Sequence, residues 1–357
     1  MKIFKVILYV FTSFLFLVVL IFSLGSILCK YIDLPETSFI QIFGYLSFYW
    51  ILVISAPVFL LLLLLPKKRK ALSFLLLMIL FTVLLNDISL KSFTRNIPEN
   101  LLSYDSLKVA AYNVKYYGYG IENILKYINE SDIDVALLSE SQLSSEKLDW
   151  LKNNVKGYSV FSDGGHDLSI LSKYPVVNYK VVELPTYLAS LSGSNDIDRL
   201  KESGIHRSFI HAIVDVNGSL VNILSLRLIA GRPKDKTISE AIRWGKYLMS
   251  AQNEELDSFL SYLNSLKGCV IFGGDLNCPP NSRIIHEIRK HVLDSYSEKH
   301  FMGSYTFKAS MPTARLDFIF HSKDIRVKRS EIVRPSLTGH PHLSDHFMIK
   351  TEFLIGK

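Results

Sequence analysis

Polar residues interrupt several apolar runs of this sequence at points where β-strands are predicted to begin or end. They are Asn113, Glu140, Asp275, Asn277, Asp317, Asp345 and His346. Hydrolysis of a phosphate ester uses these residue types: carboxylates hold Mg²⁺, a carboxylate or His takes a proton from water, and amides orient the phosphate. Gly273 and Gly274 precede Asp275 and permit a tight turn that exposes its carboxylate.

Each of these residues also has an ordinary structural interpretation. Glu140 fits a solvated strand end, and Gly274-Asp275-Leu276-Asn277 fits a turn in which Asx side chains bond local amides. Asp317 fits a buried salt bridge, and Ser344-Asp345-His346 fits a capped turn. Because all of them occur together at strand ends, the set favours a functional site over a collection of turns.

The elements that must position these residues belong to an α+β protein. Apolar runs predict strands at 109–114, 135–138, 168–171, 210–216, 220–228, 270–272, 316–320 and 347–353, and helical patterns cover 121–129, 237–266 and 282–291. Asn217-Gly218 predicts a tight hairpin turn between two of the strands. Many strands with interspersed helices over about 250 residues predict two sheets face to face with helices outside.

Residues 108–353 resemble the endonuclease/exonuclease/phosphatase superfamily, which includes DNase I-like nucleases, inositol-polyphosphate phosphatases and neutral sphingomyelinases. The matching segments are Val109-Ala110-Ala111-Tyr112-Asn113-Val114, residues 135–140, Leu168-Ser169-Ile170-Leu171-Ser172-Lys173-Tyr174-Pro175, Gly274-Asp275-Leu276-Asn277-Cys278-Pro279-Pro280-Asn281-Ser282, Arg315-Leu316-Asp317-Phe318-Ile319 and Ser344-Asp345-His346. Ser139 stands where Gln is common. The resemblance implies a four-layer α/β/β/α sandwich of the DNase I-like type, and the apolar N-terminal region resembles the membrane-attached bacterial branch.

The resemblance also implies roles for the matching residues. Glu140 is the chief Mg²⁺ ligand, with Asn113 and Asp345 nearby, and Mn²⁺ is a possible substitute. Asp275 positions or deprotonates the attacking water, and Asn277 supports the phosphate. His346 contacts the phosphate, and Asp317 holds its imidazole in the required tautomer. The implied activity is a Mg²⁺-dependent hydrolysis of a phosphodiester or phosphomonoester, with nucleic acid, a phospholipid headgroup or a small phosphodiester as substrate.

The sequence departs from the family where the run at 220–228 ends. Arg227-Leu228 stands in place of a His-Leu pair whose His faces the scissile phosphate. Arginine binds phosphate bidentately but cannot donate a proton near neutral pH. We therefore expect Arg227, with Arg207 close by in sequence, to bind substrate. A catalytically weak phosphate-ligand-binding protein of the same fold is the alternative.

The basic charge of the chain is concentrated near its N-terminus. Of 40 Lys/Arg and 33 Asp/Glu residues, nine basic and four acidic ones lie in residues 1–100, so the remainder is nearly neutral. This balance argues against a long nucleic-acid-binding face. The three cysteines form no disulfide framework. A Cys269–Cys278 bridge is possible, and buried free thiols are the favoured interpretation.

Residues 1–95 are predicted to be a membrane anchor with three transmembrane helices, at about 6–28, 42–65 and 71–90. Residues 96–106 would form a linker to the catalytic domain, 107–357. The basic cluster at 67–70 predicts a cytoplasmic loop between the second and third helices. Three crossings make this a multi-pass cell-membrane protein with its catalytic domain outside the cytoplasm, whereas two would leave it inside. No obligate protein partner is evident.

Overall fold

The computed structural model describes residues 2–31, 103–164, 166–185, 207–230, 237–300, 304–307, 314–334 and 343–356, with five single positions between 57 and 77. The chain divides into two compact units. One comprises residues 1–89 and 278–287, and the other comprises 90–277 and 288–357. All strands of the described residues belong to the second unit.

The first sheet of the second unit has six strands in the order β11-β12-β1-β2-β4-β3. Their bounds are Arg326–Val333 for β11, Met348–Gly356 for β12, Tyr104–Asn113 for β1, Val135–Ser139 for β2, Leu168–Ser172 for β4 and Ser159–Ser162 for β3. β1 pairs parallel with β2 and antiparallel with β12, so the sheet is mixed. The carboxyl ends of β1 and β2 therefore meet at one edge.

The second sheet also has six strands, in the order β5-β6-β7-β8-β10-β9. Their bounds are Val176–Glu183 for β5, Ser208–Val216 for β6, Ser219–Ser225 for β7, Val270–Asp275 for β8, Asp317–His321 for β10 and Leu293–Asp294 for β9. Asn217 (φ 54°) and Gly218 (φ 97°) form the turn between β6 and β7, which confirms the predicted hairpin. β7 and β8 are parallel, so this sheet is mixed as well.

The core lies between the two sheets. Alternate residues of a strand point to opposite faces, and in β1 this places Val109 in the cluster that also contains Ile223 and Ile271 of the second sheet. Tyr112, three residues further along β1, points to the opposite face and belongs to a separate cluster on the outer face of the first sheet. Each fully buried aliphatic side chain contributes about 1.5–3 kcal/mol, so these two clusters hold the layers together.

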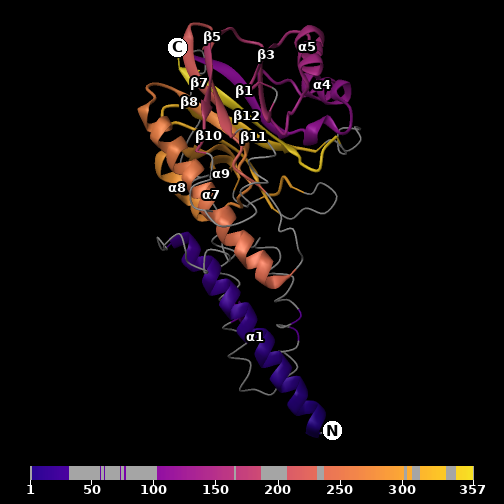
Figure 1. Ribbon diagram of the computed structural model, residues 1–357. Helices are drawn as coiled ribbons and strands as arrows, with labels where there is room; N and C mark the ends of the chain where they lie inside the picture. Colours follow the sequence, from indigo (N-terminus) through magenta and orange to yellow (C-terminus); the bar gives the residue numbers. More distant parts are fainter. Residues whose placement is uncertain are drawn as a thin grey trace. The chain divides into compact units, whose positions relative to one another are not determined.

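Helices cover both outer faces. α4 (Ile121–Glu130) and α5 (Ser145–Asn154) pack on the first sheet through the outer cluster. α7 (Ile238–Ser265) covers the second sheet, where Phe259 contacts Phe209 of β6 and Phe272 of β8 edge-on. The layers run helix, sheet, sheet, helix, as the sequence predicts (Figure 1). Short elements complete the described chain: the 3₁₀ turn η5 (Lys115–Tyr117), α8 (Arg283–His291) and α9 (Ser295–Lys299).

The first unit contains α1 (Lys2–Tyr31), which includes the first apolar stretch of the sequence. None of the helices in the described part of the chain is long and apolar enough to count as a membrane span. The second and third predicted spans, 42–65 and 71–90, lie almost entirely outside the described residues. Cys269 and Cys278 are both free thiols, as predicted, but only Cys278 is buried and Cys269 is half-buried.

Candidate active site

The site forms where the ends of strands from the two sheets meet. Asn113 ends β1 and lies opposite Ser139 of β2, while Asp275 ends β8 and lies opposite Asp317 of β10. A hydrogen bond from Asn113 Nδ2 to Asp275 Oδ2 (2.9 Å) joins the two sheets at this edge, and Ser139 Oγ accepts from Asp275 N at 3.3 Å. The packing of the two sheets thus brings together residues that are 162 positions apart in the chain.

Two glycines allow β8 to approach its neighbours closely. A Cβ on Gly274, whose φ is +142°, would lie 2.0 Å from the carbonyl oxygen of Leu226. A Cβ on Gly273 would lie 2.6 Å from the carbonyl oxygen of Phe318. Any side chain at these positions would displace backbone, so the two glycines preceding Asp275 are required by packing as well as by the turn.

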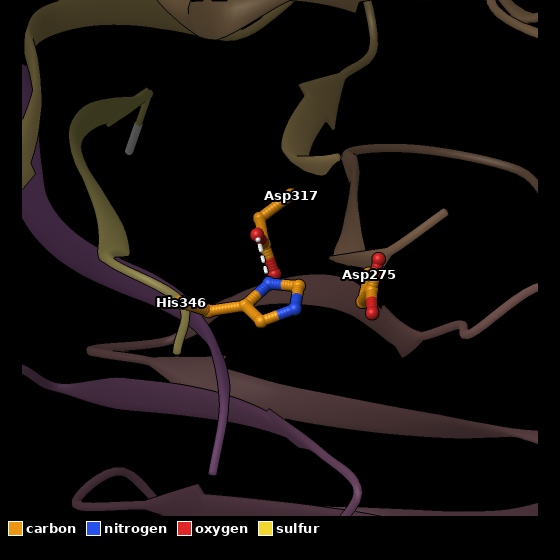
Figure 2. A group of neighbouring side chains, drawn as sticks. All are labelled: Asp275, Asp317 and His346. Atoms are coloured by element: carbon orange, nitrogen blue, oxygen red, sulfur yellow. Dashed lines mark hydrogen bonds and ion pairs between the residues drawn. The ribbon is translucent and has the colours of Figure 1, made fainter. Parts of the chain in front are cut away.

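His346 lies between two buried carboxylates (Figure 2). Its Nδ1 is 2.8 Å from Asp317 Oδ2, and its other ring nitrogen points toward Asp275. Burial alone would lower the pKa of His346. The charges of Asp317 and Asp275 and the hydrogen bond to Asp317 outweigh burial and raise the pKa to about 9. The imidazole is therefore protonated at neutral pH, and it can donate a hydrogen bond or a proton.

Asp275, like Asp317, is almost completely buried. Burial raises its pKa above the usual range, while the charges of His346 and Arg227 and the hydrogen bond from Asn113 act in the opposite direction. Its Oδ1 accepts the backbone N–H of Asn277 at 3.0 Å. A carboxylate with a raised pKa is suited to accept a proton from water. The Asn277 side chain donates to Leu228 O at 2.9 Å, which fixes its amide beside the same edge.

Glu140 and Asp345, the other two acids of the predicted site, both have basic partners. Glu140 follows β2 with a positive φ of 51°, and its carbonyl accepts Tyr116 N at 2.8 Å. Its carboxylate Oε1 accepts from Arg227 Nη2 at 2.7 Å. Asp345 Oδ2 lies 3.3 Å from Lys115 Nζ. Lys115 is held nearby because Asn113 Oδ1 accepts its backbone N–H.

Arg227 and Arg207 belong to one ion-pair network. Arg227 Nη1 lies 3.1 Å from Asp167, which Arg207 also contacts at 3.5 Å. Arg207 donates from Nε and Nη2 to Glu255 (2.7 and 3.2 Å) and from Nη2 to Arg227 O (2.6 Å). Four of the five N–H donors of this buried guanidinium are thus used by the protein, so Arg207 is placed to hold the loop that carries Arg227.

Asp167 and Glu255 are site residues that sequence reasoning missed. Asp167 precedes the run that forms β4 in the same way that Asp317 opens β10, and this position was a readable signal. Glu255 carries no such signal because it lies within the long helix α7, where an isolated acid predicts a solvated face. Only the fold shows that it is buried against Arg207.

Three side chains of the predicted site carry the oxygen types that a hard divalent cation prefers. Glu140 and Asp345 offer carboxylate oxygens and Asn113 offers an amide oxygen, the oxygen ligands that Mg²⁺ prefers. Asp275, Asp317 and His346 also place potential ligand atoms within 4.8 Å of one another. There the protonated ring of His346 is already hydrogen-bonded to Asp317, so this trio is better suited to proton transfer than to metal binding.

Comparisons with known proteins concern the fold and the family of the chain. A search of curated proteins gives no match. The fold is similar to an endonuclease/exonuclease/phosphatase from Bacteroides vulgatus (14% identity, 70% of this chain and 98% of that chain, TM-score 0.53). It is also similar to D. rerio TDP2 complexed with single strand DNA product (17% identity, 70% and 99%, TM-score 0.51) and to a functionally unknown conserved protein from Enterococcus faecalis V583 (15%, 70% and 100%, 0.51).

The match in sequence covers the whole constellation of site residues. Residues 110–346 match the profile of the Endonuclease/Exonuclease/phosphatase family, a segment that begins before Asn113 and ends at His346. This segment is more than half of the chain, and the strand ends described above all lie within it. The chain therefore belongs to the endonuclease/exonuclease/phosphatase family.

Proposed function

We propose that this protein is a divalent-metal-dependent phosphoesterase that hydrolyses a phosphodiester or phosphomonoester by attack of water. The observation that carries the proposal is the buried trio of Asp275, His346 and Asp317, joined to the first sheet through Asn113. A carboxylate with a raised pKa beside a protonated imidazole supplies a proton acceptor and a proton donor in one site.

The metal-binding residues would be Glu140, Asn113 and Asp345, with Mg²⁺ as the expected ion and Mn²⁺ as a substitute. When bound, such an ion neutralises phosphate charge and polarises the phosphorus–oxygen bonds. Asp275 would accept the proton of the attacking water as the new P–O bond forms. His346, oriented by Asp317, would give its proton to the leaving oxygen as the old P–O bond breaks.

The chemistry is tested with two chromogenic substrates on the full-length protein in detergent. We expect Mg²⁺-dependent release of p-nitrophenol from bis(p-nitrophenyl) phosphate or from p-nitrophenyl phosphate, and which of the two reacts separates diesterase from monoesterase. Glu140→Ala should abolish it through loss of metal. Asp275→Asn should lower turnover by at least about 100-fold while Mn²⁺ binding persists. Wild-type turnover in Asp275→Asn would remove Asp275 from the mechanism.

A second candidate function is a phosphate-ligand-binding protein with little turnover. The ion pair between Arg227 and Glu140 favours it, because a permanently charged group occupies the place of a family His. Tight Mg²⁺ or Mn²⁺ binding with no hydrolysis of either substrate would support this alternative. The substrate itself would then be sought by binding to phospholipid headgroups, oligonucleotides and small phosphodiesters.

Membrane attachment is part of the proposal. Its support is the apolar composition of residues 3–90 and the exposed side chains of α1, including Phe11, Phe14 and Leu17. The basic cluster at 67–70 would face the cytoplasm and the catalytic domain would lie outside it. A reporter that is active only outside the cytoplasm, fused after Lys357, should then be active. Activity of a cytoplasm-specific reporter would instead place the enzyme inside the cell.

A further inference from the structure

The cations that contact the two acidic ligands proposed for the metal differ in their surroundings. The Arg227–Glu140 pair is largely buried, with side chains 11% and 17% exposed, whereas the Lys115–Asp345 pair is 41% and 39% exposed. Water and salt weaken an exposed pair far more than a sheltered one. Of these two ion pairs, the one between Arg227 and Glu140 is therefore the stronger.

Arg227 has a second carboxylate partner, which Lys115 lacks among the described residues. Its Nη2 donates to Glu140 Oε1, while its Nη1 lies 3.3 and 3.1 Å from the two oxygens of Asp167. Its Nε has no partner among the described residues. The guanidinium thus bridges two acids. If its bond to Glu140 is broken, the contact with Asp167 still holds it.

The main chain that carries Arg227 is fixed on both sides. The bonds are Leu226 N to Gly273 O (3.0 Å), Arg207 Nη2 to Arg227 O (2.6 Å), Leu228 N to Asp275 O (3.2 Å), Asn277 Nδ2 to Leu228 O (2.9 Å), Ile229 N to Glu255 Oε2 (2.7 Å) and Gln252 Nε2 to Ile229 O (2.9 Å). A rearrangement of Arg227 is consequently confined to its side chain, which turns between fixed partners.

We propose that Asp167 is a positioning residue: it retains Arg227 beside the site when a divalent ion takes Glu140, so that the released guanidinium binds the substrate phosphate. The inference rests on the proposed function. A Glu140 oxygen bonded to a guanidinium is less available to a metal, and the like charges of metal and Arg227 repel. A guanidinium held through one edge keeps its remaining N–H groups for bidentate contact with phosphate.

Competition for Glu140 is tested by titrating Mn²⁺ into the full-length protein in detergent, with calorimetry as the readout. Arg227→Lys keeps the charge but lacks the planar fork whose separate nitrogens contact Glu140 and Asp167. We expect it to bind Mn²⁺ about tenfold more tightly than wild type, the equivalent of one charge-assisted hydrogen bond. Arg329→Gln, which removes a cation paired with Glu331 on β11, is the matched control and should leave the affinity unchanged.

The titration separates two kinds of failure. Equal Mn²⁺ affinity in wild type and Arg227→Lys would overturn the inference and leave the proposed function standing. Absence of Mn²⁺ binding in wild type, Arg227→Lys and Arg227→Gln alike would overturn both. Binding by the Arg227 variants alone would support the inference, because it identifies Arg227 as the obstacle at Glu140.

The positioning role of Asp167 is tested with inorganic phosphate as the probe, at saturating Mn²⁺. Asp167→Asn should weaken phosphate binding by about tenfold, and Asp167→Glu should recover most of the loss. If Asp167 had only a structural role, Asp167→Asn would lower thermal stability without changing the phosphate affinity of the folded protein. Unchanged phosphate affinity in Asp167→Asn would therefore overturn the inference.

Discussion

His346 shows how a single residue acquires its chemistry from its neighbours. The ring is almost completely buried, and burial on its own disfavours the charged form. Asp317 and Asp275 reverse this preference and raise the pKa of His346 in the folded protein to about 9. Because the folded pKa exceeds the usual 6.5, this proton stabilises the fold fully below pH 6.5. The contribution is lost as the pH rises through about 9.

We predict that Asp317→Asn lowers the pKa of His346 by roughly one unit or more, since it removes a charge and a charge-assisted hydrogen bond. NMR titration of the histidine ring protons measures this directly. His211, which contacts Tyr262 and Asn222 instead, is the internal control and should titrate as in wild type. The basic limb of the pH–rate profile should move to lower pH with His346. A ring that still titrates near pH 9 would show that Asp317 does not hold the proton.

The sequence predicted the positions of the site residues better than their partners. Asp275, Asp317 and His346 could be named because strand ends and glycines marked them, and the fold brings these three together. The bond between Arg227 and Glu140 joins residues 87 positions apart, and the one between Arg207 and Glu255 joins residues 48 apart. Such pairs depend on how the segments after β2 and β7 and the start of β6 pack together, which no local pattern determines.

At the scale of elements, buried strands and long helices followed from their patterns. β2, β4 and β8 are buried along their whole length, and α4 and α7 lie within one or two residues of their predicted bounds. β5 was missed because its residues are mostly exposed, and β11 because polar residues interrupt it. These are an edge strand of each sheet, where one side lacks a partner and the apolar alternation is weak.

The end of β8 gives a prediction at this scale. Gly274→Ala should destabilise the protein by about 3 kcal/mol or more, because its Cβ would meet the backbone of Leu226 at 2.0 Å and its φ is +142°. Thermal or chemical denaturation measures the loss. Gly245→Ala in α7 is the matched control: its Cβ meets nothing within 4 Å, and a helical glycine replaced by alanine gains about 0.5–1 kcal/mol. Equal stability of Gly274→Ala and wild type would refute the close approach.

Asp294 of β9 links α8, the start of α9 and the segment before β10 through its carboxylate. Its carboxylate contacts Arg315 at 2.6 Å and Arg289 at 2.7 Å, and it accepts Ser297 N at the start of α9. Burial alone would raise the pKa of Asp294, but the two arginines outweigh it and hold the pKa far below the usual range. The carboxylate therefore stabilises the fold above the unfolded pKa near 3.8, and this stabilisation falls as the pH drops below that value.

We predict that Asp294→Asn lowers the free energy of unfolding by about 3–5 kcal/mol at pH 7, because it leaves two arginines beside a neutral side chain. The difference from wild type should shrink by roughly 1.4 kcal/mol for each pH unit below the unfolded pKa, because there the unfolded wild-type chain binds a proton that the folded chain does not. Urea denaturation at pH 7 and pH 3 checks both values. Asp149→Asn removes an exposed pair with Lys152 and serves as control. If the difference in unfolding free energy between Asp294→Asn and wild type were the same at both pH values, it would contradict the lowered pKa of Asp294.

At the scale of the whole molecule, the chain combines an apolar N-terminal part with a nearly neutral catalytic part. The composition changes near residue 100, and β1 begins soon after it, at Tyr104. The order of strands within each sheet was not readable in the same way, since β1 lies between β12 and β2, from opposite ends of the domain.

The arrangement of the sheets leads to the last prediction, that the fragment 100–357 folds without the residues before it. Both sheets draw all their strands from Tyr104–Gly356, and the core between them is built from the same range. β1 lies between β12 and β2 in the first sheet. In a fragment that lacks β1, both of these strands would lose a hydrogen-bonded neighbour. We expect a soluble monomer with a cooperative unfolding transition and the Mn²⁺ affinity of the full chain. A matched fragment starting at residue 115, which removes β1 and Asn113, should not fold. Aggregated or molten 100–357 material in the absence of detergent would show that the N-terminal part contributes to the stability of the catalytic domain.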